Sequence, residues 1–268
     1  MKKNEGVYIS TKKDGSVYYR SSVTYKNKHI SLGSYETKEA ARLAYLEANR
    51  LLRSEVYVSL EEYDVHSPLP FSKWVVLVNF RDNQVYFPTP IYVRPHFFYY
   101  YYSHELILKF DVDDLFYYAS HKIMKRGGHY FVADFGMQVN ILNRYGIKNY
   151  AVCGKDYFFR NMDTTDFRRE NLVIVNRYQG VLLIPGKTGI RYRARIHVKG
   201  NYNIGTYDTI EEAAIAYNKA IDILKQNGCK KAYVPNYLEQ LSANMYADIY
   251  TRLPISGKLK KLTFPNNQ

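Results

Sequence analysis

The stretch Arg191–Tyr217, RYRARIHVKGNYNIGTYDTIEEAAIAY, shows the pattern of a strand and then the pattern of a helix. Side chains of an extended strand point alternately to its two faces. One face of residues 191–198 therefore carries apolar side chains: Tyr192, Ala194 and Ile196. The opposite face carries four basic side chains: Arg191, Arg193, Arg195 and His197. We expect one face of this strand to lie in a core and the other to present a continuous basic row.

A helix is predicted to follow the strands and to support them. Thr209 is a typical N-cap residue, and Glu212 stands three residues later, at the spacing of a capping box. Apolar residues then recur at helical spacing: Ala213, Ala216, Tyr217, Ala220, Ile221 and Leu224. Because alanine side chains are small, this helix can lie close to the apolar face of the strands.

The basic row favours contact with nucleic acid. The major groove of duplex DNA admits a β-ribbon, and guanine offers O6 and N7 there to a bidentate arginine. The alternative is a solvated sheet face, which is the commoner role of charged strand residues. Four consecutive outward positions without an acidic residue make nucleic acid the better interpretation.

The same arrangement recurs near the N-terminus. The segment LGSYET at residues 32–37 corresponds to IGTYDT at residues 204–209, and an alanine-rich helix follows each. In the first copy Thr37 is the expected N-cap. The inward strand positions are Tyr19, Ser21 and Val23, and the outward ones are Arg20, Ser22 and Thr24. Two copies so far apart predict two modules rather than a solenoid of adjacent repeats.

Both copies resemble the Apetala2-type DNA-binding domain. The shared features are Gly-Val before the first strand, three short strands, Leu/Ile-Gly-x-Tyr-x-Thr, and then Glu-x-Ala-x-x-Ala-Tyr in a helix. The resemblance covers about residues 6–53 and 180–225. It implies a sheet that enters the major groove of double-stranded DNA, with arginines of the first two strands on bases and phosphates.

Carried over to this sequence, the resemblance implies DNA contacts by Arg20, Arg191, Arg193 and Arg195. His197 and Lys199 complete the candidate set of the second copy. The first copy departs from it, because Ser22 and Thr24 replace Arg195 and His197. Whether the first copy reads bases therefore stays open, and its candidates for phosphate contact are Lys12, Lys13, Lys26 and Lys28.

The distribution of charge supports this division. Residues 1–53 contain 11 basic and 5 acidic residues, residues 54–178 contain 14 of each, and residues 179–268 contain 13 basic and 6 acidic. The net charge of +13 therefore lies entirely in the segments with the two copies. A role in solubility alone would not require that location, whereas contact with nucleic acid would.

Other functional classes find little support. Two cysteines, Cys153 and Cys229, are too few for a multi-thiolate metal site and predict reduced thiols in a cytoplasmic protein. No apolar run approaches the length of a membrane span, and the polar residues 1–6 do not suggest a signal peptide. We expect no cofactor, no metal, no membrane contact and no small-molecule substrate. Residues 256–268 are expected to form a basic tail that is mobile or contacts phosphate.

The middle of the chain predicts an α+β domain of undetermined topology. Apolar runs at residues 74–80 and 85–87 suggest strands joined by a hairpin turn at Asp82-Asn83. Further strands are expected at residues 91–94 and 129–134, and a helix at residues 113–124 that ends before Gly127-Gly128.

The segment DFRRENL at residues 166–172 is similar to the one that follows the catalytic histidine in HNH homing endonucleases, which often also carry an Apetala2-type domain. Counting back from it, the catalytic histidine and its metal-binding neighbour fall at Phe159 and Phe158, which provide neither a base nor a ligand. Phe167 replaces the usual asparagine, and no ligand-bearing helix follows Val175. Asn161, Asp163 and Asn171 remain, as turn and capping residues. The resemblance therefore implies a degenerate, noncatalytic HNH-like domain.

A rebuilt metal site is the alternative. His121 and His129 lie in the same region as four carboxylates: Asp111, Asp113, Asp114 and Asp134. A helix N-terminus attracts carboxylates, so capping is the simpler explanation for the run at residues 111–114.

These observations predict an α+β chain in four parts. They are an Apetala2-like module at 1–60, a central domain at 61–178 that is HNH-like from 130, a second module at 179–235, and an extension with a basic tail at 236–268. The expected function is sequence-specific binding of double-stranded DNA without catalysis, in regulation or as an accessory to a mobile element. The alternatives are an HNH-type homing endonuclease with a displaced active site, and a protein that binds single strands or RNA. Oligomeric state stays open.

Overall fold

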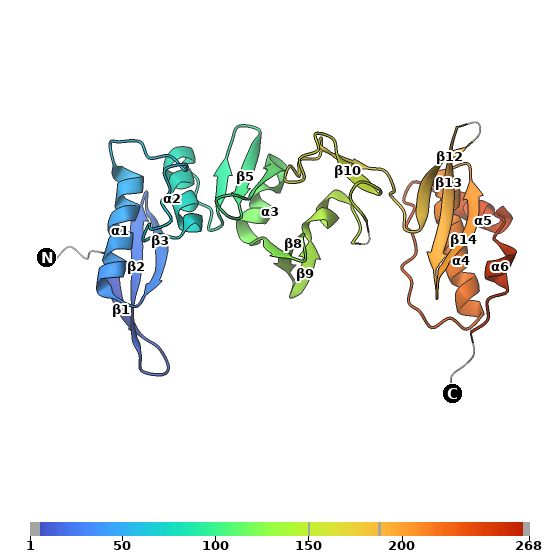
Figure 1. Ribbon diagram of the computed structural model, residues 1–268, viewed down its shortest axis with the longest axis horizontal. Coiled ribbons are helices and arrows are strands. Elements are labelled where there is room, and N and C mark those ends of the chain that lie inside the picture. The colour runs from blue at the N-terminus through green and yellow to red at the C-terminus, as the bar shows by residue number, and fades with distance from the viewer. Residues whose placement is uncertain (1–5, 150, 187–188, 265–268) are drawn as a thin grey trace. The chain divides into compact units, whose positions relative to one another are not determined.

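The computed structural model describes residues 6–149, 151–186 and 189–264 (Figure 1). The chain is α+β, as predicted, and is built of small three-stranded antiparallel sheets and helices. It divides into two compact units. One contains residues 1–145 and 159–172, and the other contains residues 146–158 and 173–268.

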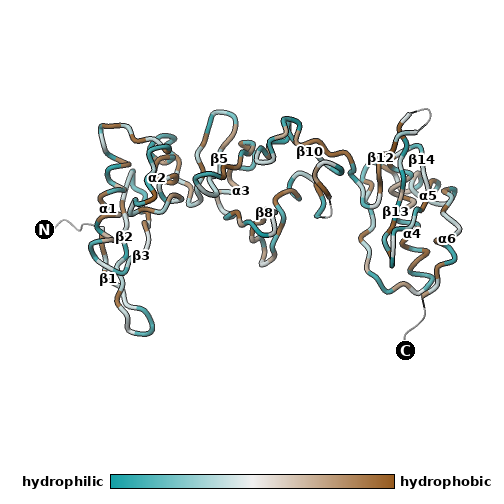
Figure 2. Tube along the Cα trace, viewed as in Figure 1, coloured by the Kyte–Doolittle hydropathy of each residue, from teal (hydrophilic) through white to brown (hydrophobic). Residues whose placement is uncertain are grey.

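The first unit begins with the predicted sheet and helix. Its strands, in the order in which they pair, are β1 (Val7–Thr11), β2 (Val17–Tyr25) and β3 (Lys28–Tyr35). Helix α1 (Lys38–Arg53) follows, and the Thr37 hydroxyl accepts a hydrogen bond from the Ala40 amide at 3.1 Å, which confirms the predicted N-cap. Polar and apolar residues alternate around α1 (Figure 2), and its buried side includes Ala41, Ala44, Ala48 and Leu51.

A second helix stands where the sequence predicted a hairpin. Residues 74–80 belong to α2 (Phe71–Asn83), so the predicted strands at 74–80 and 85–87 and their turn at Asp82-Asn83 are wrong. All seven residues from Trp74 to Phe80 are buried. A helix that is buried on every side has no polar face, and without one the 3.6-residue period disappears from its sequence.

The rest of the first unit contains two further three-stranded antiparallel sheets. One consists of β4 (Ile91–Val93), β5 (Phe97–Tyr101) and β6 (Ile107–Asp111), and the other of β7 (Met124–Arg126), β8 (His129–Asp134) and β9 (Met137–Asn140). Between them lie η1 (Val112–Asp114) and α3 (Leu115–Ser120), and η2 (Ile141–Tyr145) follows β9. The strands expected at 91–94 and 129–134 are confirmed, and the helix expected at 113–124 ends early, at Ser120.

The second unit contains the other predicted sheet and helix. Its strands pair in the order β12 (Val181–Gly186), β13 (Gly189–His197) and β14 (Asn201–Tyr207). Helix α4 (Ile210–Gln226) follows, and the Thr209 hydroxyl accepts a hydrogen bond from the Glu212 amide at 3.1 Å, as predicted. The boundary between the units falls within two short paired strands, β10 (Tyr157–Phe159) and β11 (Leu172–Ile174).

The segment after α4 belongs to the core of the second unit. It contains α5 (Ala243–Arg252) and α6 (Gly257–Lys260), and four of its leucine and isoleucine side chains join the same buried cluster as Leu224: Leu238, Leu253, Ile255 and Leu259. Residues 256–264 therefore pack on this unit instead of forming a mobile tail, and phosphate contact by their lysines stays a prediction. The last residues, 265–268, lie outside the described part of the chain.

Candidate nucleic-acid interface

The two sheet modules share one backbone arrangement at the glycine that precedes the first strand. The Gly6 carbonyl accepts a hydrogen bond from the Ser22 amide at 2.8 Å, and the Gly180 carbonyl accepts one from the Arg195 amide at 2.7 Å. Ser22 and Arg195 therefore occupy equivalent positions. It follows that Arg20 corresponds to Arg193.

Both glycines are required by what surrounds them. Gly6 and Gly180 have φ values of +66° and +72°, in the left-handed region that favours glycine. A Cβ on Gly180 would lie 2.3 Å from the ring of Tyr217, and one on Gly6 would lie 2.4 Å from the ring of Tyr45. The glycine before the first strand and the tyrosine in the helix are thus a contact pair, which explains their joint presence in both copies.

The Leu/Ile-Gly pair of the motif forms a β-bulge in each sheet. Ser21 pairs with Gly33 and Ser22 with Ser31, so Leu32 is an extra residue on β3. Ile204 is the extra residue on β14 in the same way. Leu32 and Ile204 are each 1% exposed. The bulge inserts one apolar side chain into each core, where strict alternation would have no place for it.

The tyrosine of the motif anchors later parts of the chain. The Tyr35 hydroxyl donates to the carbonyls of Leu32 and Pro68, at 3.2 and 3.3 Å, and the Tyr207 hydroxyl donates to the Pro254 carbonyl at 2.8 Å. Burial, with a smaller contribution from Glu212, raises the pKa of Tyr207 to about 12. The hydroxyl therefore keeps its proton and remains a donor across the neutral pH range.

The structure places the predicted basic row on the sheet face away from α4. Ala194 and Ile196 are buried in the core that includes α4, so their neighbours along β13 face the other way. Arg193 stands opposite Leu182 on β12 and Thr206 on β14. Arg195 and His197 stand opposite Asn203 and Asn201. The cross-strand neighbours of the row on β12 and β14 are thus apolar or neutral and polar.

The four basic residues of the row differ in how they are held. Arg191 is paired with Asp208 at 2.9 Å, with 44% of its side chain exposed, and it also reaches the Thr206 carbonyl at 3.4 Å. In the described part of the chain, the guanidinium groups of Arg193 and Arg195 have neither an ion pair nor a hydrogen bond. Arg193 and Arg195 are therefore the members of the row with free donors for a ligand.

A basic hollow adjoins the end of the row. It has a volume of 410 Å³, and its lining includes Lys155, Arg195, His197 and Lys231. Lys231 is a site residue that the sequence reasoning missed. Its ammonium group and the Tyr233 hydroxyl both donate to the His197 carbonyl at 3.0 Å. The only sequence signal was the pair Lys230-Lys231 after the helix.

His197 and Lys199 close this face at the turn between β13 and β14. His197 is exposed, and its Nδ1 lies 3.3 Å from the Asn201 side-chain oxygen. Lys199 is exposed in the turn itself. Both side chains are accessible to a ligand, and their contact with DNA stays a prediction.

The outward face of the first module is rich in hydroxyl groups instead. Arg20 is exposed, and Thr24 lies 3.4 Å from the His29 ring nitrogen. Ser22 is on the outward face, as predicted from the alternation, but it is only 7% exposed. It lies in a hollow of 330 Å³ whose lining also includes Tyr8, Ser10, Arg20, His29 and Ser31. Because Gly6 covers its backbone and larger side chains surround it, the small Ser22 is recessed between them.

The four lysines of the first module that were candidates for phosphate contact differ in their surroundings. Lys12 and Lys13 are exposed in the turn between β1 and β2, where a phosphate can reach them. Lys26 is exposed in the β2–β3 turn, and its ammonium group lies 5.7 Å from the Tyr25 ring centre. Lys28 stands opposite Tyr25, and its ammonium lies 4.9 Å above the Tyr86 ring. Lys28 thus lies on the helix side of the sheet, away from Arg20.

Residues 161–171, which include the segment compared above with HNH endonucleases, form a network of hydrogen bonds. The Asn171 side-chain oxygen accepts from the Asn161 amide at 2.9 Å, and its nitrogen donates to the Asp166 carbonyl at 2.8 Å. Asp163 accepts from the Thr165 amide and hydroxyl at 2.9 and 2.7 Å. Asn161, Asp163 and Asn171 therefore hold turns, as expected.

Two side chains just before these residues stand where the nuclease chemistry would lie. Phe159 is buried against Phe167, with ring centres 5.6 Å apart, whereas Phe158 is 41% exposed. Nearby, burial opposes ionisation of Asp166, but hydrogen bonds from Arg168 outweigh it and hold the pKa of Asp166 below its usual value. Asp166 is thus a charged structural partner of Arg168.

The aspartates of the alternative metal site have other partners. Asp114 is buried and accepts from Arg144 Nε at 2.9 Å and from the Tyr145 hydroxyl at 3.0 Å. Asp111 accepts from the Arg169 amide at 2.7 Å. Asp111 and Asp114 occupy the N-cap positions of η1 and α3, as the run at a helix N-terminus predicted, but neither side chain accepts a capping hydrogen bond from its helix.

His121 lies 3.5 Å from Asp134 and stacks on Tyr117, with ring centres 4.2 Å apart. Within the described residues, no three or more His, Cys, Asp or Glu side chains converge in a way that would hold a metal ion. Cys153 and Cys229 are free thiols.

Comparisons with protein families, curated proteins and solved structures found no match to this chain. Among its described helices, none has both the length and the apolar character needed to cross a membrane.

Proposed function

We propose that this chain is a nonenzymatic, sequence-specific double-stranded DNA-binding protein that reads the major groove with the outward face of β13. The observation that supports the proposal most directly is the pair Arg193 and Arg195. Both lie on one face of a helix-backed sheet, and neither guanidinium has a partner among the described residues. The resemblance of both modules to the Apetala2-type domain points in the same direction.

The dimensions of the row suit a duplex groove. From Arg191 to His197 the strand rises about 20 Å, so the row can follow several base pairs along the groove. Bidentate arginine contacts to guanine would supply the sequence preference. The exposed Lys199 and the hollow with Lys155 and Lys231 would meet the flanking phosphates.

The first module would contribute mainly affinity. Its outward face has one arginine, Arg20, and hydroxyl groups that can contact phosphate or sugar without strong base preference. Lys12, Lys13 and Lys26 would add phosphate contacts. Such a protein would act in the cytoplasm, in gene regulation or as an accessory to a mobile element, with no cofactor required for binding.

The proposal is tested by selecting bound fragments from a pool of random duplex DNA with the full-length protein. We expect a short enriched sequence that contains guanine at the positions met by Arg193 and Arg195. In competition at one salt concentration, the unlabelled duplex should displace the selected DNA far better than either of its single strands. Failure to enrich a sequence, or equal competition by single strands, would rule out the proposed mode of recognition.

A further inference from the structure

A further hollow lies in the first unit, and it shares no lining residue with the hollow at the β2 face. It has a volume of 610 Å³, within the usual range for small-molecule sites. Its walls come from the first turn of α2, from residues 88–90, from the end of β5 and from residues 122–125. Pro88, Pro90 and Ile123 give it an apolar surface.

Three lysines line this hollow: Lys73, Lys122 and Lys125. No carboxylate is among the lining residues, and within the described residues none of the three lysines forms an ion pair. Glu61 acts on Tyr101 from outside the lining. Three cations without a counter-charge around one cavity favour an anionic ligand.

Lys73 is the lysine held deepest. It is half-buried in the first turn of α2, and burial lowers the pKa of its ammonium group. A buried cation without a carboxylate partner is stabilised when an anion binds beside it. Ser72, the preceding residue, also lines the hollow. Pro70 is at the N-cap of α2 and provides no side-chain hydrogen bond to the helix.

The hollow also offers aromatic surface. Tyr102 is 39% exposed. The rings of Tyr102 and Tyr130 pack edge to face, with their centres 6.3 Å apart, and are not stacked on each other. Lys125 lies 5.4 Å above the Tyr130 ring. The Tyr100 hydroxyl accepts a hydrogen bond from the Ile123 amide at 3.0 Å and so joins two walls of the hollow. An aromatic ring beside a cationic cluster is the combination that binds a base together with its phosphate.

We propose that this hollow binds a nucleotide, with its phosphate between Lys73, Lys122 and Lys125 and its base against Tyr102. The volume exceeds what inorganic phosphate needs, and the aromatic wall would have no role for that ion. The same chemistry is offered by a free mononucleotide and by an unpaired nucleotide of a nucleic-acid strand. The site does not depend on the proposed function of the β13 face.

The test is calorimetric titration of the full-length protein with adenosine 5′-monophosphate, adenosine and inorganic phosphate. We expect the nucleotide to bind at least about tenfold more tightly than either part alone, since lysines and ring act together. Absence of nucleotide binding, or equal binding of inorganic phosphate, would overturn the proposal.

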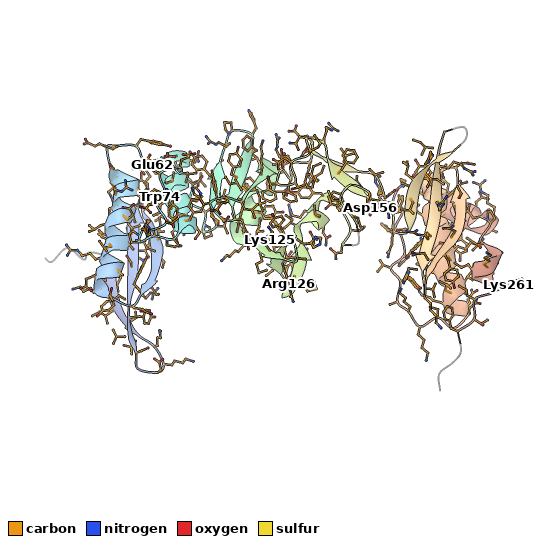
Figure 3. The ribbon with its side chains drawn as sticks, in the orientation of Figure 1. Glu62, Trp74, Lys125, Arg126, Asp156 and Lys261 are labelled. Atoms are coloured by element: carbon orange, nitrogen blue, oxygen red, sulfur yellow. The ribbon has the colours of Figure 1, made fainter. Side chains whose placement is uncertain are left out.

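Variants then locate the binding. Lys122→Gln combined with Lys125→Gln should weaken nucleotide binding at least about tenfold, and Tyr102→Ala should weaken it by about tenfold. Lys122 and Lys125 are exposed, so the fold should tolerate their replacement. The matched control is Arg126→Gln, which removes one charge next to Lys125 (Figure 3) from a residue outside the lining. A loss with Arg126→Gln as large as with the double variant would show a general charge effect and reject the site.

A last titration separates the two sources of the nucleotide. If a single strand of six deoxyadenosine nucleotides binds much more tightly than the mononucleotide, the ligand of the hollow is an unpaired nucleic-acid strand. Equal affinities would show that the ligand is a free nucleotide. Arg193→Ala combined with Arg195→Ala should leave mononucleotide binding unchanged. If that pair abolished it, the nucleotide would be bound at the β13 face and the inference would fail.

Discussion

The two sheet modules have the same backbone framework and different outward faces. In both, a glycine carbonyl before the first strand accepts an amide hydrogen bond from the middle strand, a tyrosine ring covers that glycine, and a bulge buries one extra apolar residue. On the outward face, however, Ser22 and Thr24 stand where the second module has Arg195 and His197. The fold therefore constrains the inward residues and leaves the outward ones free to differ.

That difference separates two tasks. Among the described residues, the guanidinium groups of Arg193 and Arg195 on the β13 face have no partner, whereas the β2 face offers hydroxyl groups around a recessed serine. We expect sequence preference to reside in the second module and the first to add affinity.

The largest effect should come from Arg193→Ala combined with Arg195→Ala. Each bidentate arginine contributes about 1–3 kcal/mol of discrimination, so the pair should lose about 2–6 kcal/mol between the selected sequence and a scrambled one. Fluorescence anisotropy with both duplexes measures this difference. The control is Arg252→Ala, an exposed arginine on α5. Unchanged preference in the double variant would break the assignment of base reading to β13.

Gly180→Ala should strongly destabilise the second module. The substitution forces a side chain into a positive φ and against the Tyr217 ring, which together cost about 2–4 kcal/mol. Denaturant unfolding checks this, with Gly200→Ala as the control because no atom lies within 4 Å of its added Cβ. Gly6→Ala should behave like Gly180→Ala. A clear difference between them would mean that the frameworks are not equivalent.

Arg20→Ala should weaken DNA binding by about 1 kcal/mol and leave the preferred sequence unchanged, because a phosphate contact carries no base information. It is the matched test of equivalence with Arg193. Anisotropy on the selected and scrambled duplexes distinguishes the outcomes. If Arg20→Ala relaxed the preference as much as Arg193→Ala, both modules would read bases.

The smallest effect is expected for Lys28→Gln. Its ammonium lies over Tyr86 on the helix side, so its loss should cost about 0.5–1 kcal/mol of stability. DNA affinity should stay the same, whereas Lys12→Gln combined with Lys13→Gln should lower it and reduce its salt dependence. Thermal unfolding and anisotropy at several salt concentrations provide the two measurements. A reduced salt dependence with Lys28→Gln would place that residue on the DNA-binding face instead.

The repeated strands and helices could be predicted from local patterns in the sequence. Thr37 and Thr209 cap helices, and the alternation along residues 191–197 separates buried from outward side chains, because caps and alternation depend on neighbours within a few residues. The basic row could therefore be predicted residue by residue.

The helical state of α2 and the contacts of Lys28 and Lys231 depend on tertiary packing. Helix α2 was mistaken for strands because its burial on every side erases the pattern that distinguishes a helix. The sequence could not show that Lys28 lies over Tyr86 or that Lys231 donates to the His197 carbonyl, because these partners lie far away in the sequence. A local pattern shows which way a side chain points from its own strand, but the partner that it meets there is supplied by distant residues that folding brings close.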